Sequence, residues 1–86
     1  MIEINVDSKK THFLVTITED STKTQHKVTL SDEYFNNLSS GESKEEFIKK
    51  CFIFLLEREP KESILKIFNM SLIQRHFPNF ENEIRK

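Results

Sequence analysis

The first thirty residues alternate between apolar and polar side chains with the two-residue period of a β-strand. Three apolar sets carry this period: Ile2, Ile4 and Val6; Phe13, Val15 and Ile17; and Val28 and Leu30. Polar residues that favour turns separate the sets at positions 7–10 and 20–23. Because short turns join sequential strands that pair with each other, we expect three antiparallel strands.

One pairing register places all three apolar sets on the same face. With the turn tips at Lys9-Lys10 and Ser21-Thr22, Val15 lies opposite Ile4 on one side and Val28 on the other. A slip of one residue would turn a whole apolar set to solvent, so the pattern favours this facing. The opposite face is polar apart from one leucine, and we expect it to face water.

From residue 31 onward the apolar spacing becomes helical. Ser31 precedes two acidic residues and predicts the N-cap of a short helix, while Ser43 opens a capping box at the start of the main helix. Pro60 suits the first position of a third helix, which we expect over residues 61–68. A short helix then ends before Pro78, and one last helical turn follows it.

These elements predict an α+β fold, with a three-stranded antiparallel β-meander (1–30) followed by four to five short helices (31–86) packed on one sheet face. The 86 residues fit a single domain, 1–86, and a hydrophobic share of 36% is enough for a core. The longest apolar run, Cys51 to Leu56, is too short to span a membrane, and the N-terminus lacks a secretory signal pattern. We therefore expect a cytoplasmic protein without membrane association.

The composition supports few catalytic or metal chemistries. A net charge of −1 argues against general binding to polyanions, and the single cysteine excludes a disulfide framework and multi-cysteine zinc sites. Cys51 lies on an apolar helix face, which predicts a buried and unreactive thiol. His12, His26 and His76 lack the spacing of a metal site. We predict no catalytic residue, no metal and no cofactor; an enzyme that uses His26 or His76 is a distant alternative.

The main helix carries the strongest indication of an interaction surface. Between Cys51 and Leu56 it is apolar almost all round, as in a helix that is covered on every side. At about 100° per residue, Ile53 falls on the polar side of the helix with Lys49 and Glu57. We predict an interaction surface made of these three residues and Phe80, although the C-terminal phenylalanines also suit closure of the core.

Open strand edges point to the same class of function. The predicted meander leaves two edges unpaired, at residues 2–6 and 24–30. A symmetric dimer is the commonest way for a small chain to cover such an edge. We therefore predict a small non-catalytic interaction or regulatory module, whose partner is either another protein or a second copy in a homodimer.

A nucleic-acid-associated regulator is the alternative function. Residues 64–77 fit a degenerate helix-turn-helix, in which Gln74, Arg75 and Lys66 would contact bases and phosphates. Pro78 shortens the second helix of this pair, and acidic residues follow it closely. The net charge of −1 also disfavours nucleic acid as the partner.

The second half of the chain resembles a family of short uncharacterised bacterial proteins. The resemblance rests on an FLLERE-P pattern that ends at Pro60, an ILxxF pattern that begins at Ile64, and an FPxFE ending at residues 77–81. It covers most of the chain and implies a free-standing domain with a hairpin-type N-terminal half. It implies no activity, ligand or site residue.

Overall fold

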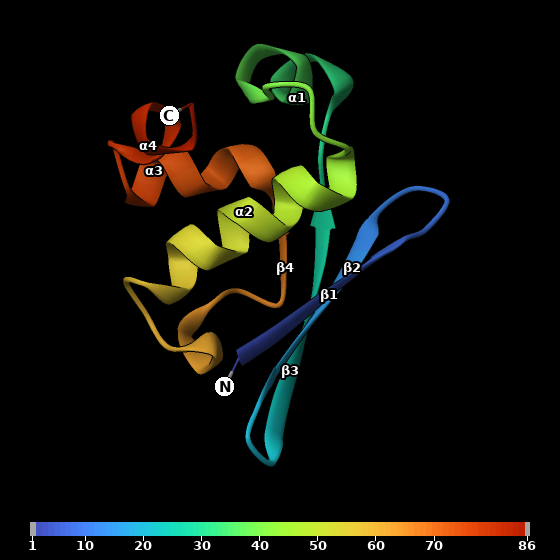
Figure 1. Cartoon of the computed structure of the whole chain (residues 1–86), viewed down its shortest axis with the longest axis vertical. Coiled ribbons are helices and arrows are strands. Elements are labelled where there is room, and N and C mark those ends of the chain that lie inside the picture. The colour runs from blue at the N-terminus through green and yellow to red at the C-terminus, as the bar shows by residue number, and fades with distance from the viewer. Residues whose placement is uncertain (1, 86) are drawn as a thin grey trace.

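The computed structural model describes residues 2–85 and has an α+β fold built on a mixed sheet (Figure 1). The strands β1 (Ile2–Ser8), β2 (Phe13–Glu19) and β3 (Thr22–Thr29) form the predicted antiparallel hairpins. A fourth strand, β4 (Ile67–Asn69), pairs parallel to β3, so the sheet order is β1-β2-β3-β4. The α+β class is confirmed, but the sheet has four strands rather than three.

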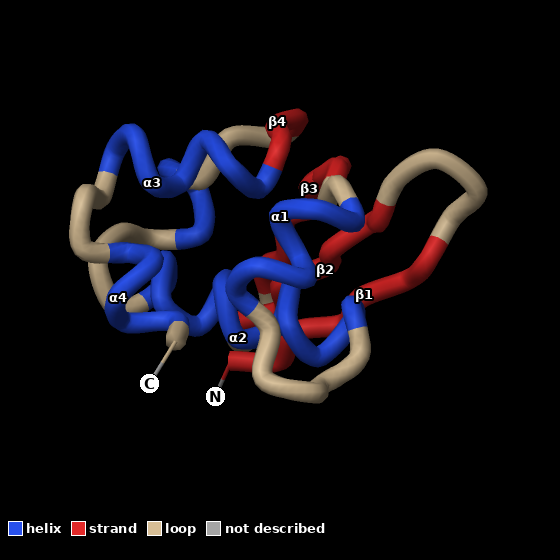
Figure 2. Tube along the Cα trace, turned by 90° about the horizontal axis from the view of Figure 1, so that it is seen from above, coloured by secondary structure: helices blue, strands red, loops and turns tan. Residues whose placement is uncertain are grey.

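The helices lie on one side of this sheet, and α2 is the helix that packs against it. They are α1 (Asp32–Leu38), α2 (Lys44–Leu56), α3 (Ile73–His76) and α4 (Phe80–Ile84), with short 3-10 turns η1 (Lys61–Ser63) and η2 (Met70–Leu72). The view from above shows α2 beside the sheet and α3 and α4 together beyond it (Figure 2). Within residues 2–85, no helix covers the other sheet face.

Both predicted helix caps are present. The Ser31 Oγ accepts a hydrogen bond from the Tyr34 N–H at 3.1 Å and begins α1. The Ser43 Oγ accepts one from the Glu46 N–H, also at 3.1 Å, and begins α2. Each bond satisfies a backbone donor that the first helical turn leaves without a partner. Short polar side chains therefore fix where the two helices start.

The hairpins keep the predicted facing but not the predicted register. Val15 lies opposite Val6 and His26, rather than Ile4 and Val28. The shift is two residues in each hairpin, because the first loop spans residues 9–12 and the second turn has its tip at residues 20–21. An even shift leaves every side chain on its original face, since side chains alternate with a period of two. The apolar set therefore still faces the helices.

The predicted helix over residues 61–68 is wrong. Only its first residues form η1, after which the chain is extended and ends in β4. Without β4, the backbone groups along the outer edge of β3 would have no hydrogen-bond partner. The extended segment supplies partners, and the Lys27 N–H donates to the Lys66 carbonyl at 2.7 Å. Pairing with a distant strand has overridden the local helical spacing, so the second of the two predicted open edges is partly covered.

Lys61 fixes the start of this extended segment. Its side chain is only 4% exposed, and its ammonium pairs with the carboxylates of Glu19 at 3.3 Å and Glu62 at 2.8 Å. Hydrogen bonds to these two carboxylates raise the pKa of Lys61. Glu19 closes the β2–β3 hairpin, so the pair ties η1 to that end of the sheet.

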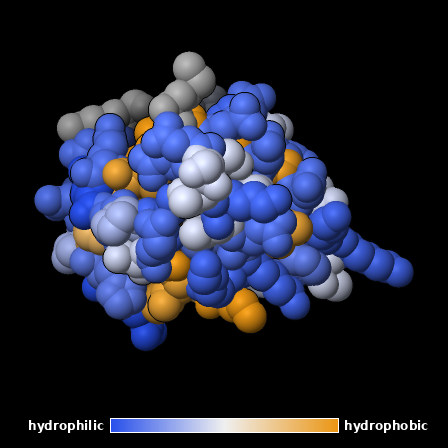
Figure 3. Space-filling model, turned by 90° about the horizontal axis from the view of Figure 1, so that it is seen from below, coloured by the Kyte–Doolittle hydropathy of each residue, from blue (hydrophilic) through white to orange (hydrophobic). Residues whose placement is uncertain are grey.

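Most of the surface seen from below is hydrophilic, and the hydrophobic residues on it appear as separate patches (Figure 3). The large apolar side chains that are exposed among residues 2–85 are Ile2, Ile53, Leu65 and Ile67. Two of these come from β1 and α2, and the other two come from the segment around β4. Scattered apolar residues are ordinary on a protein surface, so their grouping matters more than their number.

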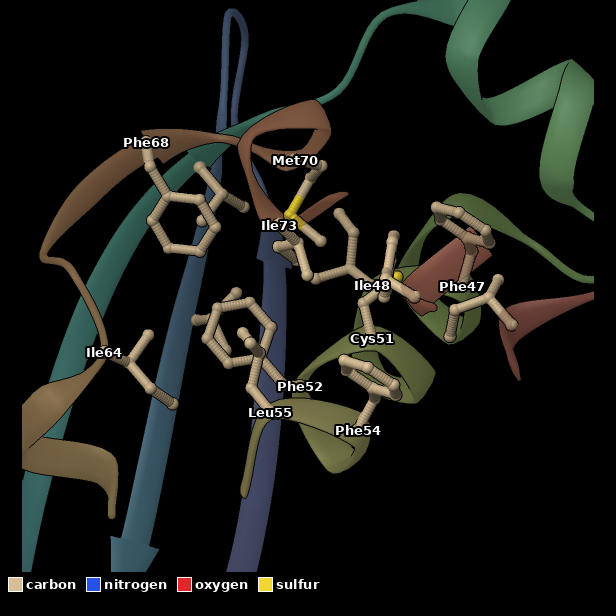
Figure 4. Close-up of a cluster of buried hydrophobic side chains, with 14 of the residues drawn as sticks. Phe47, Ile48, Cys51, Phe52, Phe54, Leu55, Ile64, Phe68, Met70 and Ile73 are labelled. Carbon is tan, nitrogen blue, oxygen red and sulfur yellow. The ribbon is translucent and has the colours of Figure 1, made fainter. Parts of the chain in front are cut away.

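The core lies between α2 and the sheet and continues to the C-terminal helices. Figure 4 shows Phe52 and Leu55 of α2 meeting Ile64, Phe68, Met70 and Ile73 from the C-terminal segment. At the other end of the core, the rings of Phe54 and Phe80 meet edge to face, with 5.1 Å between their centroids. Because α2 buries side chains against both the sheet and the C-terminal helices, only a narrow strip of it reaches solvent.

Candidate interaction surface

The strip of α2 that remains exposed borders the free edge of β1. Residues of both elements line a depression of about 370 Å³, here called the β1–α2 groove: Ile2, Glu3, Ile4, Lys49, Ile53, Leu56 and Glu57. The Ile53 side chain is 47% exposed and Ile2 is 45% exposed, while Ile4 lies at the floor with 8%. The groove is therefore apolar in the middle and charged at its rim.

The local sequence explains how this groove forms. Lys49, Ile53 and Glu57 are spaced by four residues, which places them one above the other along a single face of a helix. Alternation in β1 sends Ile2 and Ile4 to the sheet face that α2 covers. Since β1 is the outermost strand, no described strand continues the sheet beside these isoleucines. Three of the four predicted surface residues therefore lie together.

The charges at the groove's rim differ in how they are balanced. Lys49 forms no ion pair with any other residue of the described chain. The Glu57 carboxylate lies 3.3 Å from the Arg58 guanidinium. Arg58 is held in turn over the Phe54 ring, 3.7 Å from its centroid, and donates to the Phe54 carbonyl at 3.0 Å. Glu57 is also the C-cap of α2, where the helix dipole disfavours a negative charge.

Phe80 does not belong to the interaction surface. Its side chain is fully buried, and its ring packs against Phe54 in the core. The prediction failed because the C-terminal phenylalanines suit either a partner groove or the core, and the packing of α4 against α2 decided for the core. The sequence indicated residues 2–6 as an open strand edge, but not that this edge would join α2 in one groove, because that contact depends on the three-dimensional fold.

The three residues predicted to contact nucleic acid do not form a reading helix. The first half of the helix-turn-helix prediction is extended and ends in β4, and α3 has only four residues. The Gln74 side chain is engaged within the chain, since its Nε2 donates to the Pro78 carbonyl at 2.6 Å and its Oε1 accepts from the Glu81 N–H at 3.0 Å. Lys66 and Arg75 are both exposed, but Lys66 lies in the link before β4 and Arg75 lies in α3.

A second depression of about 360 Å³ lies on the side of the molecule near β4. Its apolar lining comes from α2, the extended segment and the region of α3: Leu55, Ile64, Leu65, Phe68, Ile73 and Phe77. Glu59 and His76 form its polar part. The sequence indicated an apolar C-terminal cluster, but not a groove formed by it. Unlike the β1–α2 groove, this depression has no strand edge of seven residues beside it.

His26 has a structural role. Its ring is fully buried, with the Nδ1 atom 2.7 Å from the Leu65 carbonyl and the Nε2 atom 2.8 Å from the Thr24 hydroxyl. A carbonyl only accepts, so Nδ1 carries the proton, and in the neutral ring Nε2 accepts from Thr24. Burial lowers the pKa of His26 despite the bond to Leu65, so the ring stays neutral at pH 7. Both ring nitrogens are engaged, which leaves neither for catalysis.

Cys51 is confirmed as a buried side chain. It lies between α2 and the rest of the core with no measurable exposure. Burial raises the pKa of its thiol, because the thiolate would lose its hydration.

Among residues 2–85, no three His, Cys, Asp or Glu side chains come together as a metal site. No helix within the same residues has the length and apolar character needed to cross a membrane.

Comparison with known proteins gives no match: no protein-family model, no curated protein and no solved structure matches this chain. The resemblance to short bacterial proteins therefore stays a prediction from the sequence.

Proposed function

We propose that this chain is a small non-catalytic interaction or regulatory module of the cytoplasm, which binds a protein partner through the β1–α2 groove. The groove itself carries this proposal, because it joins an apolar depression of about 370 Å³ to the open edge of β1. An extended or helical partner segment would bury Ile2 and Ile53 and would gain backbone or side-chain contacts at the rim.

Three further observations support an interaction role. The core of so small a chain does not bury Ile2 of β1 and Ile53 of α2, which both stay exposed. A partner that binds in the groove would cover both side chains. The rim presents both charge signs, Lys49 against Glu3 and Glu57, which favours a partner with opposite charges in register. The free thiol of Cys51 is compatible with a reducing compartment.

Site-specific photo-crosslinking in the native cells tests this function. The photoreactive residue p-benzoylphenylalanine is placed at Ile53, in the middle of the groove. We expect ultraviolet light to link it to a specific protein. The matched control places the same residue at Gln25, which is exposed on the bare sheet face, and should give no specific product. Absence of any product at position 53, or the same products at both positions, contradicts the proposed function.

A further inference from the structure

Two charged residues that line the β1–α2 groove are placed symmetrically about Ile53. Lys49 precedes Ile53 by four residues and Glu57 follows it by four. In a helix, four residues correspond to about 6 Å along the axis and to nearly the same angular position. A two-fold axis that passes through Ile53, perpendicular to α2, therefore brings Lys49 of one chain opposite Glu57 of a second copy, and does so twice.

We propose that the β1–α2 groove is the interface of a symmetric homodimer, in which two α2 helices cross antiparallel at Ile53 and Lys49 of each copy pairs with Glu57 of the other. This inference rests on the proposed function, because it names the partner of the same surface. The two Ile53 side chains meet at the axis, and each copy covers the apolar groove residues of the other, Ile2, Ile4 and Leu56. Two-fold contacts use one patch twice, so one self-complementary strip is sufficient.

The electrostatics of the single chain favour this occupant. Lys49 has no ion pair among residues 2–85, although it borders an apolar depression. Glu57 lies at the C-terminal end of α2, where the partial negative charge of the helix makes a carboxylate unfavourable. Arg58 balances part of this charge. In the dimer, Lys49 of the second copy pairs with Glu57, and Glu57 of the second copy pairs with Lys49. The uncharged Ile53 lies at the two-fold axis.

Charge reversal gives this geometry a distinctive test. The variant Lys49→Glu presents two acidic residues on the strip, and Glu57→Lys presents two basic residues. Each variant alone would place like charges opposite each other twice in a dimer. Mixed in equal amounts, the two variants form a heterodimer in which both contacts again join opposite charges. A parallel crossing would also join opposite charges in the mixture, but it would place like charges opposite each other in the natural chain. A stable natural dimer together with two weakened variants and a restored mixture therefore indicates the antiparallel contact.

Light scattering coupled to size exclusion, at tens of micromolar protein and low salt, measures the result. We expect the natural sequence to be a dimer and each charge variant to dissociate at least about tenfold more readily. Equimolar mixing of the two variants should restore the dimer mass. Ile53→Lys should be a folded monomer, as judged by circular dichroism. The matched control Lys23→Glu makes the same charge change on the bare sheet face and should stay dimeric.

Other outcomes overturn the homodimer. A monomeric natural chain at this concentration, dimers that persist in both charge variants, or a mixture that stays monomeric each contradict the proposed contact. The photo-crosslinking experiment separates this failure from failure of the proposed function. A product at position 53 with a different protein retains the interaction role and excludes the second copy as partner, whereas absence of any product contradicts both.

Discussion

The two edges of the sheet are built in opposite ways. β1 is a seven-residue strand whose partner β2 follows it after a short loop. β4 has three residues and pairs with β3 across the whole of α1 and α2. Besides the β3–β4 pairing itself, two bonds from neighbouring residues of β3 hold the residues just before β4: the Lys27 N–H donates to the Lys66 carbonyl, and the His26 ring donates to the Leu65 carbonyl.

This difference decides which edge is available to a partner. A short strand presents few unpaired backbone groups, which is one way in which proteins protect a sheet edge. β1 has no such protection and lies beside the exposed strip of α2. The seven-residue edge strand β1 is therefore suited to binding a partner, while the three-residue edge strand β4 is suited to closing the core over Phe68.

The largest expected loss of stability comes from a substitution in β2, the strand between β1 and β3 on which both edges of the sheet depend. Val15 is fully buried in β2, so Val15→Asp places a charge without a partner in the core and should cost about 4 kcal/mol or more of the free energy of unfolding. A domain of this size has little stability to spare, so the variant should be largely unfolded. Circular dichroism during a urea titration measures this.

Thr16→Asp is the matched control for that variant. Thr16 is the next residue along β2 and faces the bare side of the sheet, where its hydroxyl accepts from the Gln25 amide at 3.4 Å. A carboxylate there stays hydrated, so the free energy of unfolding should change by less than about 1 kcal/mol. Equal loss in both variants would show that the facing of β2 is wrong.

The second prediction breaks the β4 edge alone. Phe68 points into the core, with its ring 6.0 Å from that of Phe52. Phe68→Ala should therefore cost about 3 kcal/mol of unfolding free energy. The neighbouring Ile67 is 73% exposed, so Ile67→Ala should change stability by less than about 0.5 kcal/mol. Urea unfolding of the two variants compares them, and an equal loss of stability in both would show that the alternating facing of β4 is wrong.

These contrasts show which parts of the fold were predictable from the sequence. Caps at Ser31 and Ser43 and the facing of the strands depend on neighbours in the chain, so local patterns were sufficient for them. The register depends on loop length, which no asparagine-glycine turn fixed here. β4 depends on an edge about forty residues away, and the spacing of Ile64, Leu65 and Phe68 suits a helix equally well.

The same distinction applies to the candidate site. The helical wheel identified Ile53, Lys49 and Glu57, because their exposure depends on the geometry of α2 alone. Ile2 and Ile4 could not be assigned to the groove, since strand facing does not say which helix lies above them. Phe80 was placed on the wrong side because its burial depends on the packing of α4 against Phe54.

The third prediction breaks the bond that holds the extended segment to β3. His26→Phe keeps a ring against Phe52 but leaves the Leu65 carbonyl and the Thr24 hydroxyl without their partner. Leaving such groups unpaired should cost about 2 kcal/mol of unfolding free energy. Gln25→Ala, at the adjacent exposed position, should be nearly neutral. Hydrogen exchange should rise at Lys27 in the first variant only, because its N–H bonds to Lys66 beside the lost contact.

The smallest expected effect is a pH dependence that belongs to the same histidine. Burial lowers the pKa of His26 below its ordinary value of 6.5, so the unfolded chain takes up a proton there more readily than the folded chain. The free energy of unfolding should therefore fall as the pH decreases through about 6.5, and should recover as the pH rises again. The direction is fixed by the fact that the unfolded state binds more protons in this range.

Urea midpoints measured between about pH 7 and 5.5 test this, because that window lies above the ordinary range of carboxylate titration. The natural sequence should lose stability across the window, and His26→Phe should show a shallower slope from a lower starting stability. Gln25→Ala should keep the slope of the natural sequence. If His26→Phe retains the full slope, the proton uptake belongs to another group. The prediction that the neutral His26 ring stabilises the β4 edge in a pH-dependent way would then be wrong.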